Sequence, residues 1–338
     1  MVYKKKFFIF IVFIFFAFVR SEDQENKLGE KHFIVIVEGF NCKDFYKKSL
    51  DSIFSQVYEN YDVIIIDDCS DDGTGKLIQN YIKENSVEGK IREFIINKKQ
   101  RYKIANLYNV INNFCKDTDI IVEFSLCDNF LNDKVLLNLN KIYSDPNIWL
   151  TYGNFLYYPY GEIIDVTLDI PEKIIQENAL RESEWAYRGD ILPNGCSYRG
   201  LTSYYAGLFK LIKKDDLLYF GENSNFKGDF FPFFSNHAVI LPMLEMCRNN
   251  HFKFLAEFYI MCYKDMEGMY LKTRIVNKES KKIIKDLPKY PSLDFPIWDL
   301  LLCKTIIKDF LEKSNHKKVI KKSEKKERRK RYRGRRRR

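Results

Sequence analysis

The chain has 338 residues, of which 46% are hydrophobic, so it can bury a sizeable core and is not a predominantly disordered protein. Its formal net charge of +10 is concentrated in residues 317–338, which hold 7 Lys and 8 Arg against 2 Glu. The rest of the chain is weakly acidic, so the basicity does not indicate that the folded part binds nucleic acid.

The N-terminus carries an apolar segment. Three lysines precede thirteen consecutive apolar residues, Phe7 to Val19, and a charged stretch follows. This pattern is typical of a secretory signal covering residues 1–21. An uncleaved membrane anchor is the equal alternative, although a bilayer span takes about twenty residues. We therefore expect a protein that is exported or membrane-anchored.

The first folded segment has the pattern of a parallel crossover. Two short runs rich in β-branched residues, 33–37 and 63–66, predict strands that are covered on both faces. Between them, one helix face is predicted by Tyr46, Leu50, Ile53, Phe54 and Val57. A strand, a helix and a strand in this order form a right-handed parallel unit.

The same alternation continues to about residue 152. Further strands are predicted at 93–96, 119–124 and 148–152, with amphipathic helices before and between them. We therefore expect an α/β fold with a mostly parallel central sheet flanked by helices. Beyond Gly153 the regularity weakens, and a last helix is predicted by Trp298, Leu301, Leu302, Ile306 and Phe310.

Four acidic residues follow the second predicted strand. Asp67, Asp68, Asp71 and Asp72 lie at the carboxyl end of that strand, where ligands of such sheets bind. Carboxylates this close repel one another unless cations, backbone donors or ligand hydroxyls compensate them. The alternative is that Asp71 and Asp72 cap the helix that starts near Thr74.

The eight cysteines show no close pairs and no spacing typical of a zinc site. Export would permit disulfides. We expect most of these cysteines to be buried free thiols.

Two turns carry a resemblance to a known family. The first is Glu38 to Asn41 (EGFN), and the second is Ile66 to Thr74 (IDDCSDDGT). Both resemble motifs of family 2 glycosyltransferases with the GT-A fold. Four further segments resemble a bacterial and viral subgroup of these enzymes and extend the resemblance over about residues 33–265; they are 97–112, 132–155, 204–219 and 241–246.

The resemblance implies a nucleotide site and a metal motif. It places five residues at the nucleotide: Asn41, Asp67, Asp68, Arg101 and Asn106. In the family an Asp-x-Asp motif holds Mn²⁺ or Mg²⁺ on the diphosphate, whereas this chain reads Ser125, Leu126, Cys127 and Asp128. Asp128 alone remains to face the cation, and a soft cysteine sulfur is a poor ligand for these hard ions.

The position of the family's catalytic base is also changed. The resemblance places that base at Asn236, which cannot accept a proton, and the adjacent His237 is a weak substitute. The alternative for His237 is a surface or structurally satisfied histidine. An arginine common in the subgroup is replaced by Thr202.

The resemblance implies transfer of a hexosyl unit from a nucleoside-diphosphate sugar, such as a UDP-sugar, to a glycan, lipid or protein acceptor by inverting displacement. The alternative is an inactive pseudo-glycosyltransferase that binds a nucleotide sugar, a glycan or a partner. We expect a glycosyltransferase-like domain over 32–265, a helical extension over 266–316 and a basic, disordered tail over 317–338. The N-terminal segment and the tail could contact a membrane surface; nucleic-acid binding is disfavoured because the tail has one aromatic residue, Tyr332.

Overall fold

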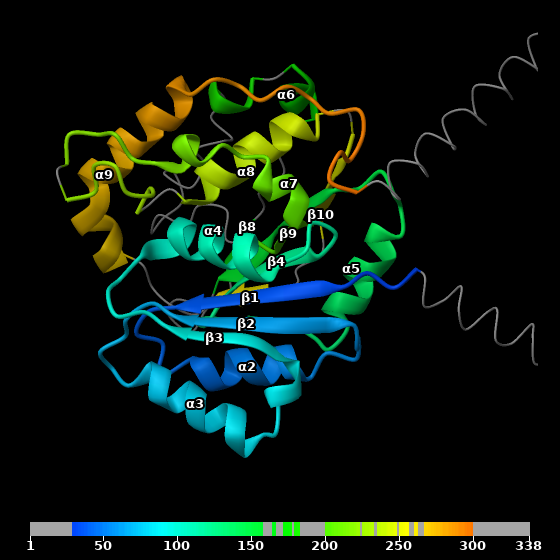
Figure 1. The fold of residues 1–338 in the computed structure, drawn as a ribbon, viewed down its shortest axis with the longest axis vertical. Coiled ribbons are helices and arrows are strands. Elements are labelled where there is room, and N and C mark those ends of the chain that lie inside the picture. Colours follow the sequence, from blue (N-terminus) through cyan, green and yellow to red (C-terminus); the bar gives the residue numbers. More distant parts are fainter. Residues whose placement is uncertain are drawn as a thin grey trace, which may run out of the picture.

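The structure is a computed structural model (Figure 1). It describes residues 29–157, 164–166, 172–177, 179–182, 200–223, 225–232, 235–248, 250–256, 260–262 and 267–299. The predicted signal or anchor, the basic tail and residues 301–310 of the predicted last helix lie outside the described residues. Within the described part of the chain, no helix combines the length and the apolar character needed to cross a membrane.

The first part of the chain forms the expected parallel unit. Its strands are β1 (Phe33–Gly39), β2 (Tyr61–Asp67), β3 (Ile91–Ile96) and β4 (Ile120–Ser125). Its helices are α2 (Tyr46–Phe54), α3 (Thr74–Glu84) and α4 (Tyr102–Phe114). Figure 1 shows α2 and α3 on one face of these strands and α4 on the other. Because both faces are covered, β1 and β2 are almost entirely buried.

The central sheet has seven strands in the order β10-β6-β9-β4-β1-β2-β3. The three further strands are β6 (Leu150–Gly153), β9 (Thr202–Tyr205) and β10 (Phe252–Leu255). β9 lies between β4 and β6 and is antiparallel to both, while all other neighbours in this sheet are parallel. The expected α/β fold with a mostly parallel sheet flanked by helices is confirmed.

A second, smaller sheet begins with the strand that follows β4 in the chain. Its order is β5-β11-β7-β8, from β5 (Asp128–Phe130), β11 (Ile260–Cys262), β7 (Phe155–Tyr157) and β8 (Ile164–Val166). The remaining helices are α5 (Val135–Tyr143), α6 (Glu172–Gln176), α7 (Ala206–Lys210), α8 (Ser235–Met246) and α9 (Glu267–Asp286). Short 3₁₀ turns are η1 (Glu88–Lys90), η2 (Leu180–Glu182) and η4 (Lys214–Leu217).

The buried face of α2 is shorter than its sequence pattern indicates. Leu50 and Ile53 are fully buried, as expected. Val57 lies beyond the end of the helix at Phe54 and is 50% exposed, so its assignment to the helix face is wrong. The chain turns at Ser55, and the backbone N–H of Val57 instead donates to the carbonyl of Asp133.

Candidate functional site

The carboxyl ends of β1 to β4 meet at one edge of the central sheet. Gly39 at the end of β1 pairs with Asp67 at the end of β2. The N–H of Asp68 donates to the carbonyl of Gly39 over 2.8 Å, and the N–H of Asn97 donates to the carbonyl of Asp67 over 2.9 Å. On the other side of β1, Glu38 pairs with Ser125. The sequence motifs at 38–41, 66–74 and 125–128 are therefore brought together at this edge.

Asp68 holds the start of α4 in place. Its Oδ1 accepts the side-chain amide of Asn97 at 2.7 Å and the backbone N–H of Arg101 at 2.9 Å. Its Oδ2 accepts the backbone N–H of Tyr102 at 2.9 Å. These donors include two of the unpaired N–H groups at a helix start, where a negative charge is stabilised. Asp68 is 2% exposed, so it contributes to the site chiefly by fixing the loop after β3.

Asp67 is held by its own loop. Its Oδ1 accepts hydrogen bonds from both the backbone N–H and the hydroxyl of Ser70, and the residue is 1% exposed. Its Oδ2 would lie 2.5 Å from a Cβ atom built on Gly75, in the first turn of α3. A glycine is therefore required for α3 to approach this carboxylate. Asp67 ends an inner strand and Asp68 directly follows it, and both carboxylates are in contact with the protein.

The next two acids belong to the turn. Asp72 accepts the backbone N–H and the hydroxyl of Thr74 and, from the first loop, the backbone N–H of Lys43. Burial acts to raise the pKa of Asp72, but these hydrogen bonds outweigh it and hold the pKa below its usual range. Asp72 therefore fits the alternative in which an aspartate caps the start of α3, because it accepts the N–H of Thr74, the first residue of that helix. The N–H of Asp71 donates to the side chain of Asn41, which adopts a left-handed backbone with φ of 53°.

A polar network lies under this edge of the sheet. Burial raises the pKa of Glu38 to about 7, the carboxylates of Asp68 and Glu123 add to this, and Lys103 and Asn106 oppose it. Glu123 in turn pairs with Lys103 at 2.5 Å and accepts the hydroxyl of Tyr204 at 2.7 Å. The network therefore connects β1, β4, β9 and α4 beneath the loops of the site.

The other predicted nucleotide residues lie close by. Asn106 on α4 is buried, and its side-chain oxygen accepts the amide of Asn97 at 2.9 Å. Arg101 is exposed at the start of α4, with its backbone bound to Asp68. The structure thus brings Asn41, Arg101 and Asn106 to the same edge as Asp67 and Asp68.

A disulfide joins two of the site's loops. It links Cys42, after β1, to Cys127, between β4 and β5, and both residues are buried. The expectation of free thiols is therefore wrong for this pair, because the fold brings together two cysteines that are 85 positions apart. Among the described residues, Cys69, Cys115 and Cys247 are free.

The residues at the metal motif are poor ligands for a hard divalent cation. Such ions take oxygen ligands from one or two carboxylates, phosphates and waters, whereas Cys127 offers a sulfur that is used in the disulfide. Asp128 is 7% exposed and is the one carboxylate retained from the motif. Within the described part of the chain, no group of three or more His, Cys, Asp and Glu side chains is arranged to hold a metal ion.

The predicted base positions lie on α8. The backbone of Asn236 is in the first turn of this helix, and the adjacent His237 is 0% exposed. Its burial excludes the surface histidine of the alternative, and in the conformation described an acceptor cannot reach this imidazole. Thr202 is 7% exposed on β9, and its hydroxyl donates to the carbonyl of Gly200 at 3.2 Å.

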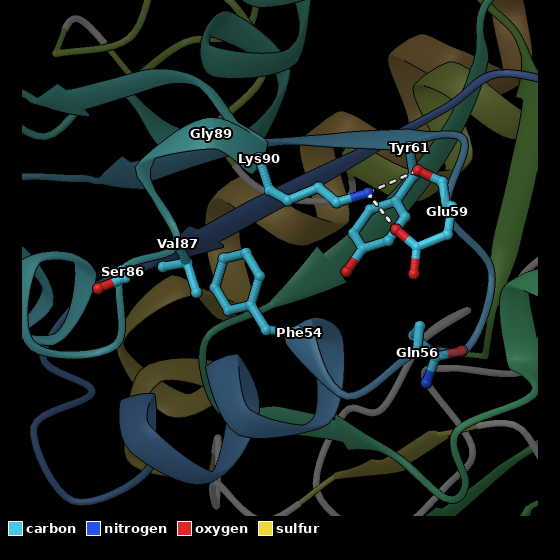
Figure 2. Close-up of a pocket in the computed structure, with 8 residues that line it drawn as sticks. All are labelled: Phe54, Gln56, Glu59, Tyr61, Ser86, Val87, Gly89 and Lys90. Carbon is cyan, nitrogen blue, oxygen red and sulfur yellow. Dashed lines mark hydrogen bonds and ion pairs between the residues drawn. The ribbon is translucent and has the colours of Figure 1, made fainter.

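A surface pocket of about 380 Å³ lies at the opposite edge of the sheet (Figure 2). It is next to the first residue of β2, Tyr61, and to the turn that precedes β3. Its one lysine, Lys90, already contacts Glu59 at 3.1 Å and lies 4.5 Å from the centre of the Tyr61 ring. The pocket is therefore separate from the motif residues.

Sequence reasoning missed two features of the site. One is the buried carboxyl group of Glu38. The signal for it is a single acidic residue that directly follows five apolar residues of β1. The other is the disulfide, whose two cysteines each follow closely after a strand end. The pairing follows from β1 and β4 being neighbours in the sheet. It could not be predicted from the sequence alone, because the strand order was not known.

Comparisons with known proteins agree with the resemblance. Residues 34–185 match the model of the family described as glycosyl transferase family 2. A curated relative from Bacillus subtilis (strain 168), the putative teichuronic acid biosynthesis glycosyltransferase TuaG, is 24% identical over 160 residues. The match covers 44% of this chain and 57% of TuaG, so the chain spans little more than half of the length of that relative.

Solved structures of similar fold include complexes with nucleotide sugars. TarS from S. aureus, in complex with UDP-GlcNAc, is 17% identical with a TM-score of 0.45, covering 76% of this chain and 68% of TarS. The mannosyltransferase PcManGT from Pyrobaculum calidifontis, in complex with GDP-Man and Mn²⁺, is 14% identical with a TM-score of 0.45. That match covers 77% of this chain and 66% of PcManGT. Both TM-scores are low, so these likenesses are loose.

Proposed function

Residues 34–185 belong to glycosyltransferase family 2, and from this premise we propose that the chain transfers a hexosyl unit from a nucleoside-diphosphate sugar to a glycan, lipid or protein acceptor. The observation that carries the proposal is the convergence of the motif segments at the carboxyl edge of β1, β2 and β4. Ligands of open parallel sheets bind at this edge.

The geometry supports a nucleotide at this edge. Asp68 fixes the loop that begins at Asn97 and presents Arg101, and Asn41 ties the first loop to the second through Ser70. Loops fixed in this way provide a preorganised surface for a ligand. We propose that Asn41, Arg101 and Asn106 lie beside the nucleotide, while Asp67 and Asp68 hold the loops that present them.

The transfer itself would be an inverting displacement. An acceptor hydroxyl attacks the sugar carbon as the bond from that carbon to the diphosphate oxygen breaks, and the hydroxyl proton must pass to a base. Asn236 cannot take this proton, and His237 is buried. Asn236, at the position that the resemblance indicates, is therefore not the base, and His237 would act as one only after a change of conformation that exposes it.

The test is transfer by the purified full chain. UDP-glucose, UDP-galactose and UDP-N-acetylhexosamines are supplied with glycan acceptors, and released UDP is measured. We expect release with at least one donor, and a loss of about 10-fold or more in Asp68→Asn, because the loop before α4 loses charged acceptor bonds. Asp215→Asn, at an exposed position on η4, is the matched control. Absence of release with every donor would contradict catalysis.

A second candidate is a non-catalytic domain that binds a nucleotide sugar, a glycan or a partner. The specific observation is that Cys127, at the metal motif, is consumed in a disulfide and that an asparagine stands at position 236. We expect the combination of Ser125→Asp, Cys127→Asp and Asn236→Asp, with Cys42→Ser to remove the unpaired thiol, to create activity. Wild-type turnover as fast as that of this variant would exclude the second candidate.

We also propose that the domain resides in an oxidising compartment, exported or anchored through residues 1–21. Disulfides persist in such compartments and are rare in the cytosol. The Cys42–Cys127 bond supports this location. Mass spectrometry of the protein from its own host, alkylated before lysis, should recover the linked pair; recovery of both cysteines as alkylated thiols would contradict the location.

A further inference from the structure

The Cys42–Cys127 disulfide occupies the place where a metal-dependent site needs a free ligand. We infer that this chain binds the nucleoside diphosphate part of its ligand without a divalent cation, with the disulfide holding the two loops together and basic side chains supplying the positive charge. The inference rests on the proposed function, because it concerns how the same site binds a nucleotide.

The disulfide is anchored on both sides. The N–H of Cys42 donates to the hydroxyl of Thr74 at 2.9 Å, and its carbonyl accepts the N–H groups of Phe45 and Tyr46 at the start of α2. The N–H of Cys127 donates to the hydroxyl of Ser125 at 3.1 Å. The bond therefore connects the loop after β1, which also contacts the loop after β2, to the loop after β4.

The two loops are also in close contact beside the bond. The N–H of Leu126 donates to the carbonyl of Glu38 at 2.9 Å. A Cβ atom on Gly39 would lie 2.6 Å from the Cβ atom of Leu126 and 3.1 Å from the sulfur of Cys42. There is no room here for an additional side chain. A rearrangement that offered the Cys127 sulfur to a cation would have to break the disulfide and separate these loops.

The side chain at position 127 carries no negative charge, unlike a ligand of a metal site, because its sulfur is in the disulfide. A thiol must be free and deprotonated to bind a metal, and a disulfide sulfur carries no charge. At diphosphate sites Mg²⁺ is held by one or two protein carboxylates together with phosphate oxygens and waters, and Asp128 is the single carboxylate that remains at the metal motif of this chain. The diphosphate would therefore enter a site in which its negative charge must be balanced by the protein.

Basic residues are available in the two loops at the same edge. Lys43 directly follows Cys42, and its backbone is fixed by Asp72 at 3.1 Å. Lys98, Lys99 and Arg101 lie in the segment between β3 and α4, and all four of these basic side chains are exposed. Ammonium and guanidinium groups form strong, charge-assisted hydrogen bonds to phosphate oxygens. These side chains can thus replace the charge of the cation.

The first experiment is calorimetric titration of the full chain with UDP and with GDP, once with EDTA and once with Mn²⁺. We expect at least one nucleotide to bind with the same Kd, within about 3-fold, in both conditions. Binding that needs Mn²⁺, or that Mn²⁺ strengthens by about 10-fold or more, overturns the inference and leaves the proposed function standing. If neither UDP nor GDP binds, with EDTA or with Mn²⁺, the proposed function itself is refuted.

The second experiment tests the source of positive charge. Lys43→Ala and Arg101→Ala should each weaken nucleotide binding by about 10-fold in EDTA, because each removes a charged donor. Lys83→Ala, at an exposed lysine in the last turn of α3, is the matched control and should leave Kd unchanged. Unchanged Kd in both loop variants would contradict the basic-residue part of the inference.

The third experiment restores the metal motif. The double variant Cys42→Ser with Cys127→Asp removes the disulfide and adds a carboxylate next to Asp128. It should bind the nucleotide more weakly in EDTA and gain about 10-fold or more with Mn²⁺. The same response to Mn²⁺ in wild type and variant would contradict the inference. Near-ultraviolet circular dichroism confirms folding, and the loop variants above test the inference if this variant does not fold.

Discussion

At the scale of single residues, the aspartates between residues 67 and 72 have two structural roles: they fix the loops around the site, and they accept hydrogen bonds at the starts of α3 and α4. Asp67 and Asp68 accept five hydrogen bonds from Ser70, Asn97, Arg101 and Tyr102. Asp72 accepts bonds from Lys43 in the first loop and from Thr74 at the start of α3. Backbone donors thus compensate most of the negative charge. The sequence predicted that the charge must be compensated, and the structure identifies the protein itself as the source of the donors.

Glu38 gives a prediction for the pH dependence of stability. Its pKa is raised from 4.5 to about 7 in the folded protein, first by burial and then by Asp68. Because this carboxyl pKa is raised, the contribution of Glu38 to stability is greatest below pH 4.5, decreases as pH rises from 4.5 to about 7 and is constant above. Glu38→Gln should therefore raise the free energy of unfolding at pH 8 by about 1–3 kcal/mol and change it little at pH 5.

The measurement for Glu38 is urea unfolding at both pH values. Glu84→Gln, at an exposed position in the last turn of α3, is the control and should have the same small effect at pH 5 and pH 8. Equal effects of Glu38→Gln at the two pH values would show that the Glu38 carboxyl does not titrate in this range.

Gly75 gives a second prediction at this scale. A Cβ atom there would lie 2.5 Å from Oδ2 of Asp67, so the first turn of α3 or the carboxylate must shift. Gly75→Ala should destabilise the fold by about 1–3 kcal/mol. Gly89→Ala is the matched control, because a Cβ atom on Gly89 meets nothing within 4 Å. Thermal unfolding of both variants provides the comparison; equal midpoints would refute the close contact.

At the scale of elements, strands β1 to β4 and helices α2 to α5 follow from hydrophobic periodicity, whereas the short strand β5 was not predicted. Their apolar residues meet one continuous core, so local pattern and tertiary packing agree. The insertion of β9 between β4 and β6 could not be predicted in this way. Its four residues, Thr202 to Tyr205, are all buried. Their sequence, TSYY, does not alternate between apolar and polar side chains, so it gives no strand signal. Strand order depends on long-range pairing, which periodicity does not report.

The disulfide is the covalent link between these elements, and its removal tests its contribution to stability. Cys42 and Cys127 are 85 positions apart, so the bond restricts a long loop of the unfolded chain. Cys42→Ser with Cys127→Ser should lower the free energy of unfolding by about 2–5 kcal/mol. Cys69→Ser, at a free and partly exposed thiol, should have little effect. Denaturant unfolding of both variants without reductant is the measurement, and equal losses would contradict the prediction.

At the scale of the whole molecule, one buried ion pair joins three segments of the second half. Arg181 contacts Glu245 on α8 through two hydrogen bonds of 2.7 and 2.9 Å, and both side chains are 0% exposed. Arg181 also donates to the carbonyl of Ile284 on α9, while Glu245 accepts the N–H of Tyr290. The segment around η2, α8 and the end of α9 are thereby fixed to one another.

Removal of one partner should be costly because it leaves a buried charge unpaired. Glu245→Ala should destabilise the protein by about 3–5 kcal/mol. The exposed pair Lys173–Glu177 on and after α6 is the control, and Glu177→Ala should change stability by about 0.5 kcal/mol or less. Urea unfolding followed by tryptophan fluorescence measures both. A small effect of Glu245→Ala would show that the pair does not hold these segments together.

The position of β9 has a consequence for synthesis of the chain. Strands β1 to β4 are complete by residue 125, but the partner that covers the free side of β4 begins at residue 202. While the ribosome adds the intervening residues, the nascent sheet presents unpaired N–H and C=O groups along an apolar strand. Such an edge is a template for pairing with another chain. Chaperone demand during translation should therefore peak over this interval and end once Thr202 to Tyr205 have docked.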